Sequence, residues 1–126
     1  MTGGVTVFVD ARNVLRSEWP NRSEGEIAEL CCAWAAREGH RAVVVFDGNA
    51  PWVTGAGDCA VIGTRGETAD ERLERLAAEL AADRRPYWLV TSDRALRAAA
   101  GRQAVRVVGG GAFLGLIRSA PGRAGT

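Results

Sequence analysis

Short, largely continuous apolar runs constrain the fold of this chain more than any other feature. The runs are Val5–Val9, Ala42–Phe46, Cys59–Ile62, Tyr87–Thr91 and Ala104–Val108. Because they do not alternate regularly with polar residues, they are typical of strands covered on both faces, as in a parallel sheet. The first two stop at an aspartate, and the fourth is followed by one two residues later.

Helical patterns fill the gaps between these runs. Ser23 and Glu26 have the spacing of a capping box, and apolar residues follow at helical intervals. Thr68 and Glu71 repeat the pattern, and a third helix is expected over about residues 93–100. This alternation predicts a three-layer α/β domain with a central parallel sheet and right-handed crossovers.

Length and composition favour one soluble domain. At 126 residues the chain is long enough for a single core. We expect a domain over residues 1–118 and a disordered tail over residues 119–126. No apolar run approaches the ~20 residues of a membrane span, and the N-terminus lacks a basic region, so a cytoplasmic protein is expected. Cys31, Cys32 and Cys59 contain no C-x-x-C pair. That excludes a zinc knuckle, and three free thiols suit a reducing compartment.

Several enzyme classes lack their required residues. His40 is the only histidine and lies in a glycine-arginine turn without a G-x-S-x-G motif, so we interpret it as a surface loop residue. A haloacid-dehalogenase phosphatase needs Asp-x-Asp after the first strand, where position 12 is Arg. A two-component receiver needs a late lysine, and the chain has none. The net charge of +1 does not by itself indicate a nucleic-acid ligand, although residues 64–126 are basic.

Four aspartates are expected at one edge of the sheet. Asp10 and Asp47 directly follow the first two strands, and Asp93 follows the fourth. Asp70 lies in the first turn of a crossover helix, which starts at the same edge. Any one of them can be a turn or cap residue, and Asp47 before Gly48 fits a turn equally well. Together their repulsion favours a divalent cation, and oxygen ligands favour Mg²⁺ or Mn²⁺ over zinc.

These segments also resemble a known family. Asp10–Val14, Glu67–Leu73 and Val90–Arg94, together with Val45–Gly48, resemble in order the motifs of YacP-like NYN domains, a branch of the PIN-like nuclease fold. The resemblance covers about residues 5–113. It implies the strand order 3-2-1-4-5 and metal-dependent cleavage of RNA.

Site residues follow from the resemblance position by position. Asp10, Asp70 and Asp93 match the acidic catalytic and metal-binding set, Asn13 matches the asparagine beside it, and Asp47 matches a second-strand acid that also binds metal. One departure is Ala11, which stands where the family usually has glycine.

The sequence therefore predicts a metal-dependent endoribonuclease that hydrolyses RNA phosphodiester bonds with Mg²⁺ or Mn²⁺. The alternative is a non-catalytic NYN module that binds RNA or a protein partner through the same acidic edge. RNA is the expected partner, the ribosome or another RNA-processing protein is a candidate one, no membrane is expected, and oligomerisation stays open. Asn13 would orient a ligand or a water, or else satisfy its own backbone at a helix start.

Arginines and tryptophans near the same edge are candidates for contacts with the substrate. The predicted substrate-binding residues are Arg12, Arg16, Trp19, Ser92 and Arg94. The arginines fit solvated surface positions as well as phosphate contacts. Trp19 and Trp52 fall in loop-like stretches where they can stack on unpaired bases. Gly109–Gly111 is interpreted as a flexible turn, because no P-loop lysine follows it.

Overall fold

A computed structural model of the chain describes residues 4–52 and 58–118. These residues form one parallel five-stranded sheet in the order β3-β2-β1-β4-β5, as predicted. The predicted tail, residues 119–126, lies outside the described residues. In chain order the elements are β1 (Thr6–Asp10), α1 (Ala11–Leu15), α2 (Glu24–Glu38), β2 (Arg41–Phe46), β3 (Cys59–Gly63), α3 (Ala69–Ala82), β4 (Tyr87–Val90), α4 (Arg94–Ala100), β5 (Arg106–Val108) and α5 (Gly110–Arg118).

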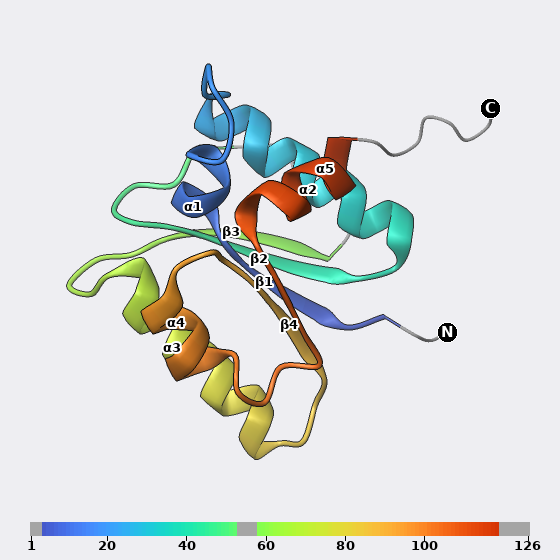
Figure 1. The fold of residues 1–126 in the computed structure, drawn as a ribbon, viewed down its shortest axis with the longest axis vertical. Helices are drawn as coiled ribbons and strands as arrows, with labels where there is room; N and C mark the ends of the chain where they lie inside the picture. Colours follow the sequence, from blue (N-terminus) through green and yellow to red (C-terminus); the bar gives the residue numbers. More distant parts are fainter. Residues whose placement is uncertain (1–3, 53–57, 119–126) are drawn as a thin grey trace.

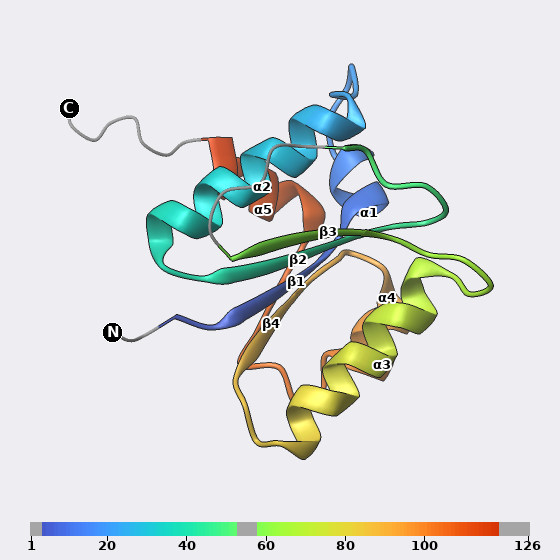
Figure 2. The ribbon, with the colours of Figure 1, turned by 180° about the vertical axis from the view of Figure 1, so that it is seen from behind.

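Helices cover both faces of the sheet, which explains the continuous apolar strands. The helices α1, α2 and α5 lie on one face, and α3 and α4 lie on the other (Figures 1 and 2). Side chains along β1 alternate between the two layers: Val7 and Val9 pack with Phe113, whereas Phe8 packs with Leu73. The first strand therefore belongs to both cores, and the polar site begins where it ends.

Both predicted capping boxes are present. The Ser23 hydroxyl accepts a hydrogen bond from the Glu26 amide at 3.1 Å, and the Glu26 carboxylate accepts one from the Ser23 amide at 3.0 Å. Thr68 and Glu71 make the same pair of bonds at 3.1 and 2.9 Å. These bonds satisfy amides that no helix turn can reach, so they fix where α2 and α3 begin.

The interpretation of Gly109–Gly111 as a flexible turn is wrong, because α5 begins at Gly110. Glycine has a low helix propensity, which hid this helix in the sequence. Burial overrides that propensity. Phe113 and Ile117, one helical turn apart, are buried in the core between the sheet and the helices α1 and α2.

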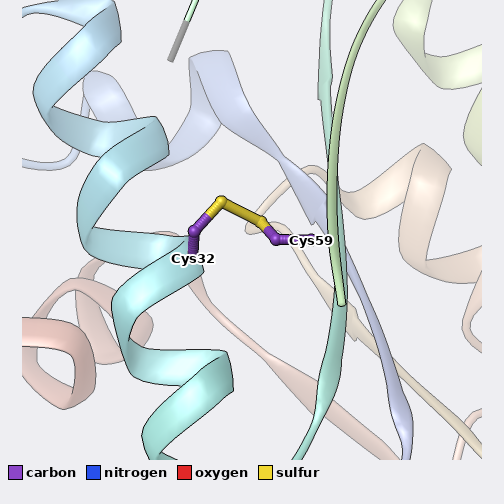
Figure 3. The surroundings of a disulfide bond; sticks show 2 residues. All are labelled: Cys32 and Cys59. Carbon is purple, nitrogen blue, oxygen red and sulfur yellow. A yellow bond between two sulfur atoms is a disulfide. The ribbon is translucent and has the colours of Figure 1, made fainter. Parts of the chain in front are cut away.

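The interpretation of all three cysteines as free thiols is also wrong. Cys32 of α2 and Cys59 of β3 form a disulfide with their Cα atoms 5.4 Å apart (Figure 3). Packing of α2 over the edge of the sheet brings the two residues together, and sequence spacing alone does not reveal that contact. The inference of a reducing compartment depended on three free thiols. Because two of the cysteines form a disulfide, that inference loses its support. Cys31 is a buried free thiol of the core, and burial raises its pKa to about 12.

His40 is half-buried rather than a free loop residue. Its Nδ1 accepts a hydrogen bond from the Val5 amide at 3.2 Å, and its ring lies 5.2 Å from those of both Trp34 and Trp88. It precedes β2, at the edge of the sheet opposite Asp10. In the described part of the chain, no helix is both long and apolar enough to cross a membrane.

Candidate active site at the carboxyl edge of the sheet

Asp10 is the most buried of the candidate acids. It is the last residue of β1, and only 7% of its surface is exposed. The hydroxyl of Thr91, which is fully buried, donates a hydrogen bond to Asp10 Oδ2 at 2.8 Å. The two side chains meet because β1 pairs with β4 as far as Val9 and Val90. Burial raises the pKa of Asp10, and the hydrogen bond from Thr91 partly opposes that rise.

Thr91 also orders the loop that carries Asp93. Its Oγ1 accepts a hydrogen bond from the Asp93 amide at 3.1 Å. Asp93 Oδ1 in turn accepts one from the Leu96 amide at 2.9 Å and so caps α4. Sequence analysis treated Thr91 only as the end of a strand. A polar residue closing an apolar run, two positions before a predicted metal ligand, was the signal that could have identified it.

Asp70 belongs to α3, which covers the face of the sheet opposite α1. It is the second residue of α3, and the neighbouring Glu71 is held by the capping box, as predicted. Burial raises the pKa of Asp70 first, and the negative charges of Asp10, Asp93 and Asp47 raise it further. Since charge interactions weaken with distance, the four carboxylates share one neighbourhood. Asp70 therefore lies within electrostatic reach of the other three acids that the sequence placed at this edge.

Asp47 differs from the others because its carboxylate is already used by the fold. It is exposed just beyond β2, and its Oδ1 accepts a hydrogen bond from the Ala69 amide at 2.7 Å. Ala69 is the first residue of α3, so this bond anchors the helix that carries Asp70. Asp47 is thus more than a turn residue, and its second oxygen still belongs to the acidic edge.

Asn13 joins three separate elements rather than satisfying its own backbone. Its Oδ1 accepts a hydrogen bond from the Ser92 amide at 2.9 Å. Ser92 Oγ then accepts one from the amide of Gly110, the first residue of α5. A Cβ atom at Gly110 would lie 2.5 Å from both Asn13 Oδ1 and Ser17 Oγ. Only glycine lets α5 approach α1 this closely, which gives Gly110 a role that the sequence interpretation missed.

Two of the predicted substrate-binding residues, Arg12 and Arg16, lie beside this edge. Arg12 Nη2 donates to the Asp47 carbonyl at 3.4 Å, and the positive charge of Arg16 acts to lower the pKa of Asp10. Trp19 is 87% exposed, as is Trp52. Arg94 is exposed at the start of α4 and forms no ion pair with any described residue.

Comparison with known proteins agrees with this architecture. A model of the YacP-like NYN domain matches residues 7–122. The chain belongs to this family. No curated protein gave a match. Two crystal structures of Rae1 (YacP) from Bacillus subtilis are similar to this NYN domain. The W164L mutant has a TM-score of 0.72 and 26% identity, over 91% of this chain and 76% of that one. The second structure has a TM-score of 0.69 and 25% identity, over 90% and 74%.

The acids of this NYN domain have the right chemistry for a hard divalent cation, although they are not closed around one. Within residues 4–52 and 58–118, no three His, Cys, Asp or Glu side chains form a ready metal cage. The converging side chains are nevertheless all carboxylates, with neither imidazole nor thiolate among them, and they repel one another. Such a donor set fits Mg²⁺ or Mn²⁺, both of which keep several water ligands and need few protein ones.

Proposed function

We propose that this NYN domain is a metal-dependent endoribonuclease that hydrolyses RNA phosphodiester bonds with Mg²⁺ or Mn²⁺. One observation carries the proposal: the charges of Asp10, Asp47 and Asp93 all raise the pKa of Asp70 at the carboxyl edge of a nuclease-type fold. Carboxylates that repel one another gain from a bound cation, and the chain has no lysine to neutralise them, although the charge of Arg16 acts on Asp10. Perturbed acids at this edge are typical of functional sites in parallel sheets.

Asp10, Asp70 and Asp93 would hold the cation, with Asp47 contributing its second oxygen. When bound, such a cation supplies Lewis-acid stabilisation and a water that ionises more readily. Asp10 has a fixed position, because it ends a central strand and is held by Thr91. Asp93 has one oxygen bound to the start of α4, so its other oxygen is the one directed to a ligand.

Neutral residues around the acids orient the substrate and the water. The Oδ1 atom of Asn13 is bound to Ser92, which leaves its Nδ2 group to donate to a phosphate oxygen or a water. The Ser92 hydroxyl accepts from Gly110 and retains a proton to donate.

Arg12, Arg16 and Arg94 would contact phosphates, and Trp19 would stack on an unpaired base.

A cleavage assay tests the proposal. Single-stranded and structured RNA would be incubated with the protein and Mn²⁺, Mg²⁺ or EDTA, with Asp10→Asn as the matched inactive variant. We expect internal cleavage with either metal, loss of cleavage in EDTA, and loss of cleavage in the variant. Tight RNA or protein binding without cleavage under every condition would instead support the alternative, a non-catalytic NYN module. Equal cleavage by parent and variant would identify a contaminating nuclease.

A further inference from the structure

A small basic pocket borders the acidic edge. Its volume is about 190 Å³, and its lining residues are Arg12, Leu15, Arg16, Asn21 and Arg22. Arg12 and Arg16 are four residues apart on α1 and its C-cap, so they project from the same side of the helix. Arg22 comes from the segment between α1 and α2. The residues that line the pocket therefore include three arginines from two parts of the chain.

The charge in this pocket is only partly balanced. Glu18 binds Arg22 at 3.1 Å and Arg118 at 2.6 Å. Among the described residues, neither Arg12 nor Arg16 has a carboxylate within ion-pair distance. Like charges around one pocket repel one another, and an anion bound among them reduces that repulsion. The pocket therefore favours an anionic ligand.

The position of the pocket indicates which anion it takes. The charge of Arg16 reaches Asp10, and Arg12 donates to the carbonyl of Asp47, so the pocket lies directly beside the acidic edge. The planar fork of arginine matches the oxygens of a phosphate. Trp19, 87% exposed, lies in the loop that leads to Arg22. An exposed aromatic side chain in the loop that also supplies a pocket arginine suits a strand whose bases are unpaired.

We propose that Arg12, Arg16 and Arg22 form a subsite for one internal phosphate of single-stranded RNA, next to the phosphate that is cleaved. Trp19 stacks on a base of the same strand. The inference rests on the proposed function and deepens it, because it selects single-stranded over duplex RNA. Glu18 keeps Arg22 oriented toward the pocket while Arg12 and Arg16 supply the uncompensated charge.

Equilibrium binding tests the subsite without cleavage. The probe is a dye-labelled, unstructured 12-nucleotide RNA, and all variants carry Asp10→Asn. Arg12→Ala and Arg16→Ala are introduced singly and together, and Arg37→Ala is the matched control. Arg37 is exposed in the last turn of α2, near the opposite edge of the sheet.

We expect the double variant to bind about tenfold more weakly than the Arg37→Ala control. The slope of log K against log salt should fall by about 0.7, the value for one phosphate contact on a single strand. Because both arginines hold the same phosphate, the second substitution should weaken binding less than the first. Affinity equal to that of the control, or a slope loss of twice this size, would overturn a shared subsite.

Further probes distinguish single-stranded from duplex RNA, and an internal phosphate from a 5′-terminal one. Trp19→Ala should weaken single-stranded binding by about 5- to 150-fold, the range for one stacked base, and should leave binding to a duplex of the same sequence unchanged. RNA with a 5′-phosphate and RNA with a 5′-hydroxyl should bind equally well. A requirement for the 5′-phosphate would overturn the internal position, and preference for the duplex would overturn the single-stranded substrate.

The failure of this inference can be told apart from that of the proposed function. If the parent does not cleave RNA with Mn²⁺ but its binding depends on Arg12 and Arg16, the subsite stands and the nuclease proposal fails. If the parent cleaves RNA and the double variant, made without Asp10→Asn, keeps the KM of an Arg37→Ala control in the same active background, the nuclease proposal stands and the subsite fails.

Discussion

Asp10 and Asp47 look equivalent in the sequence, yet the structure gives them different tasks. Each follows a buried apolar strand, and the two strands are neighbours in the sheet. Asp10 is buried and receives one hydrogen bond from a neutral threonine. Asp47 is exposed and accepts a hydrogen bond from the first amide of α3. The same sequence pattern therefore marks a desolvated site acid in one strand and a helix anchor in the next.

The difference follows from position in the sheet. β1 is central and has β2 and β4 on either side, so its end is covered by α1 and by the loop after β4. β2 lies between β1 and the edge strand β3, and Asp47, which follows it, accepts a hydrogen bond from the first amide of α3. The carboxylate at the end of the central strand is buried, whereas the one beyond β2 is used by a helix amide.

Substitution of the two aspartates by asparagine should separate these tasks most strongly. Asp10→Asn should lower kcat/KM for RNA by about 10³-fold or more, because it removes the most buried acid of the proposed metal site. Asp47→Asn keeps an oxygen for the Ala69 amide and should cost about tenfold at most. Cleavage rates at saturating Mn²⁺ would check this, with circular dichroism as the control for folding. Equal losses in the two variants would contradict the distinction.

The disulfide should matter for the outer strands and not for the site. The bond between Cys32 and Cys59 closes a loop with a sequence separation of 27 and ties α2 to the edge strand β3. On the chain-entropy model, such a loop contributes about 3 to 4 kcal/mol to the free energy of unfolding. The double variant Cys32→Ser/Cys59→Ser should lose about this much in urea unfolding. It should retain kcat at temperatures where it stays folded, and loss of kcat there would link the outer strands to the site.

Removal of the Thr91 hydroxyl should affect Asp10 and also the Asp93 amide that donates to the same oxygen. Burial raises the pKa of Asp10 and the Thr91 hydrogen bond lowers it, so Thr91→Val should raise that pKa further. Protons then compete with the metal up to a higher pH, so the acid limb of the pH–rate profile should shift to higher pH. Activity near neutral pH should fall by about 10- to 100-fold, as for other residues that position a ligand. Thr91→Ser keeps the hydroxyl and should restore the parent profile. An unchanged acid limb in Thr91→Val would show that the bond does not hold the acid.

Much of this arrangement could be predicted from the sequence because it depends on local patterns. Continuous apolar runs indicated a sheet covered on both faces, and two capping boxes fixed the starts of α2 and α3. The aspartates at the strand ends then followed from the geometry of parallel sheets. The residues Asp10, Asp47, Asp70 and Asp93 were all placed at one edge in this way.

The parts that could not be predicted depend on contacts distant in sequence. The Thr91–Asp10 hydrogen bond spans 81 residues, and the one from Ser92 to Asn13 spans 79. The disulfide and the helix that begins at Gly110 likewise need tertiary packing. The hydrogen bond from the Ala69 amide to Asp47 could not be predicted for the same reason.

The smallest effects on stability concern the first turn of α3. Glu71→Ala removes the capping-box bond to the Thr68 amide and should cost about 0.5–2 kcal/mol of unfolding free energy, with a modest loss of rate. Asp70→Asn should abolish activity without lowering the melting temperature of the metal-free protein.

The sign for Asp70 follows from its raised pKa. The folded state binds the proton more tightly than the unfolded state does, so its stability falls as the pH rises from about 3.8, the ordinary pKa of an aspartate, through the folded pKa. Asp70→Asn should therefore stabilise the metal-free protein at neutral pH, and the difference should vanish below the unfolded pKa. Melting curves of both variants from pH 3 to pH 7.5 would check this. If Glu71→Ala were inactive and Asp70→Asn active, the site acid would be Glu71 instead.

The response of thermal stability to Mn²⁺ tests the central claim most directly. For the parent protein in EDTA and in Mn²⁺ at 100 times its Kd, we expect a gain of about 2.7 kcal/mol if the unfolded chain does not bind. That gain corresponds to a rise in melting temperature of about 10 °C for a domain of this size. Asp10→Asn should lose nearly all of the rise, and Asp47→Asn should keep most of it. No rise in the parent with millimolar Mn²⁺, or an equal rise in parent and Asp10→Asn, would contradict a metal site at this edge.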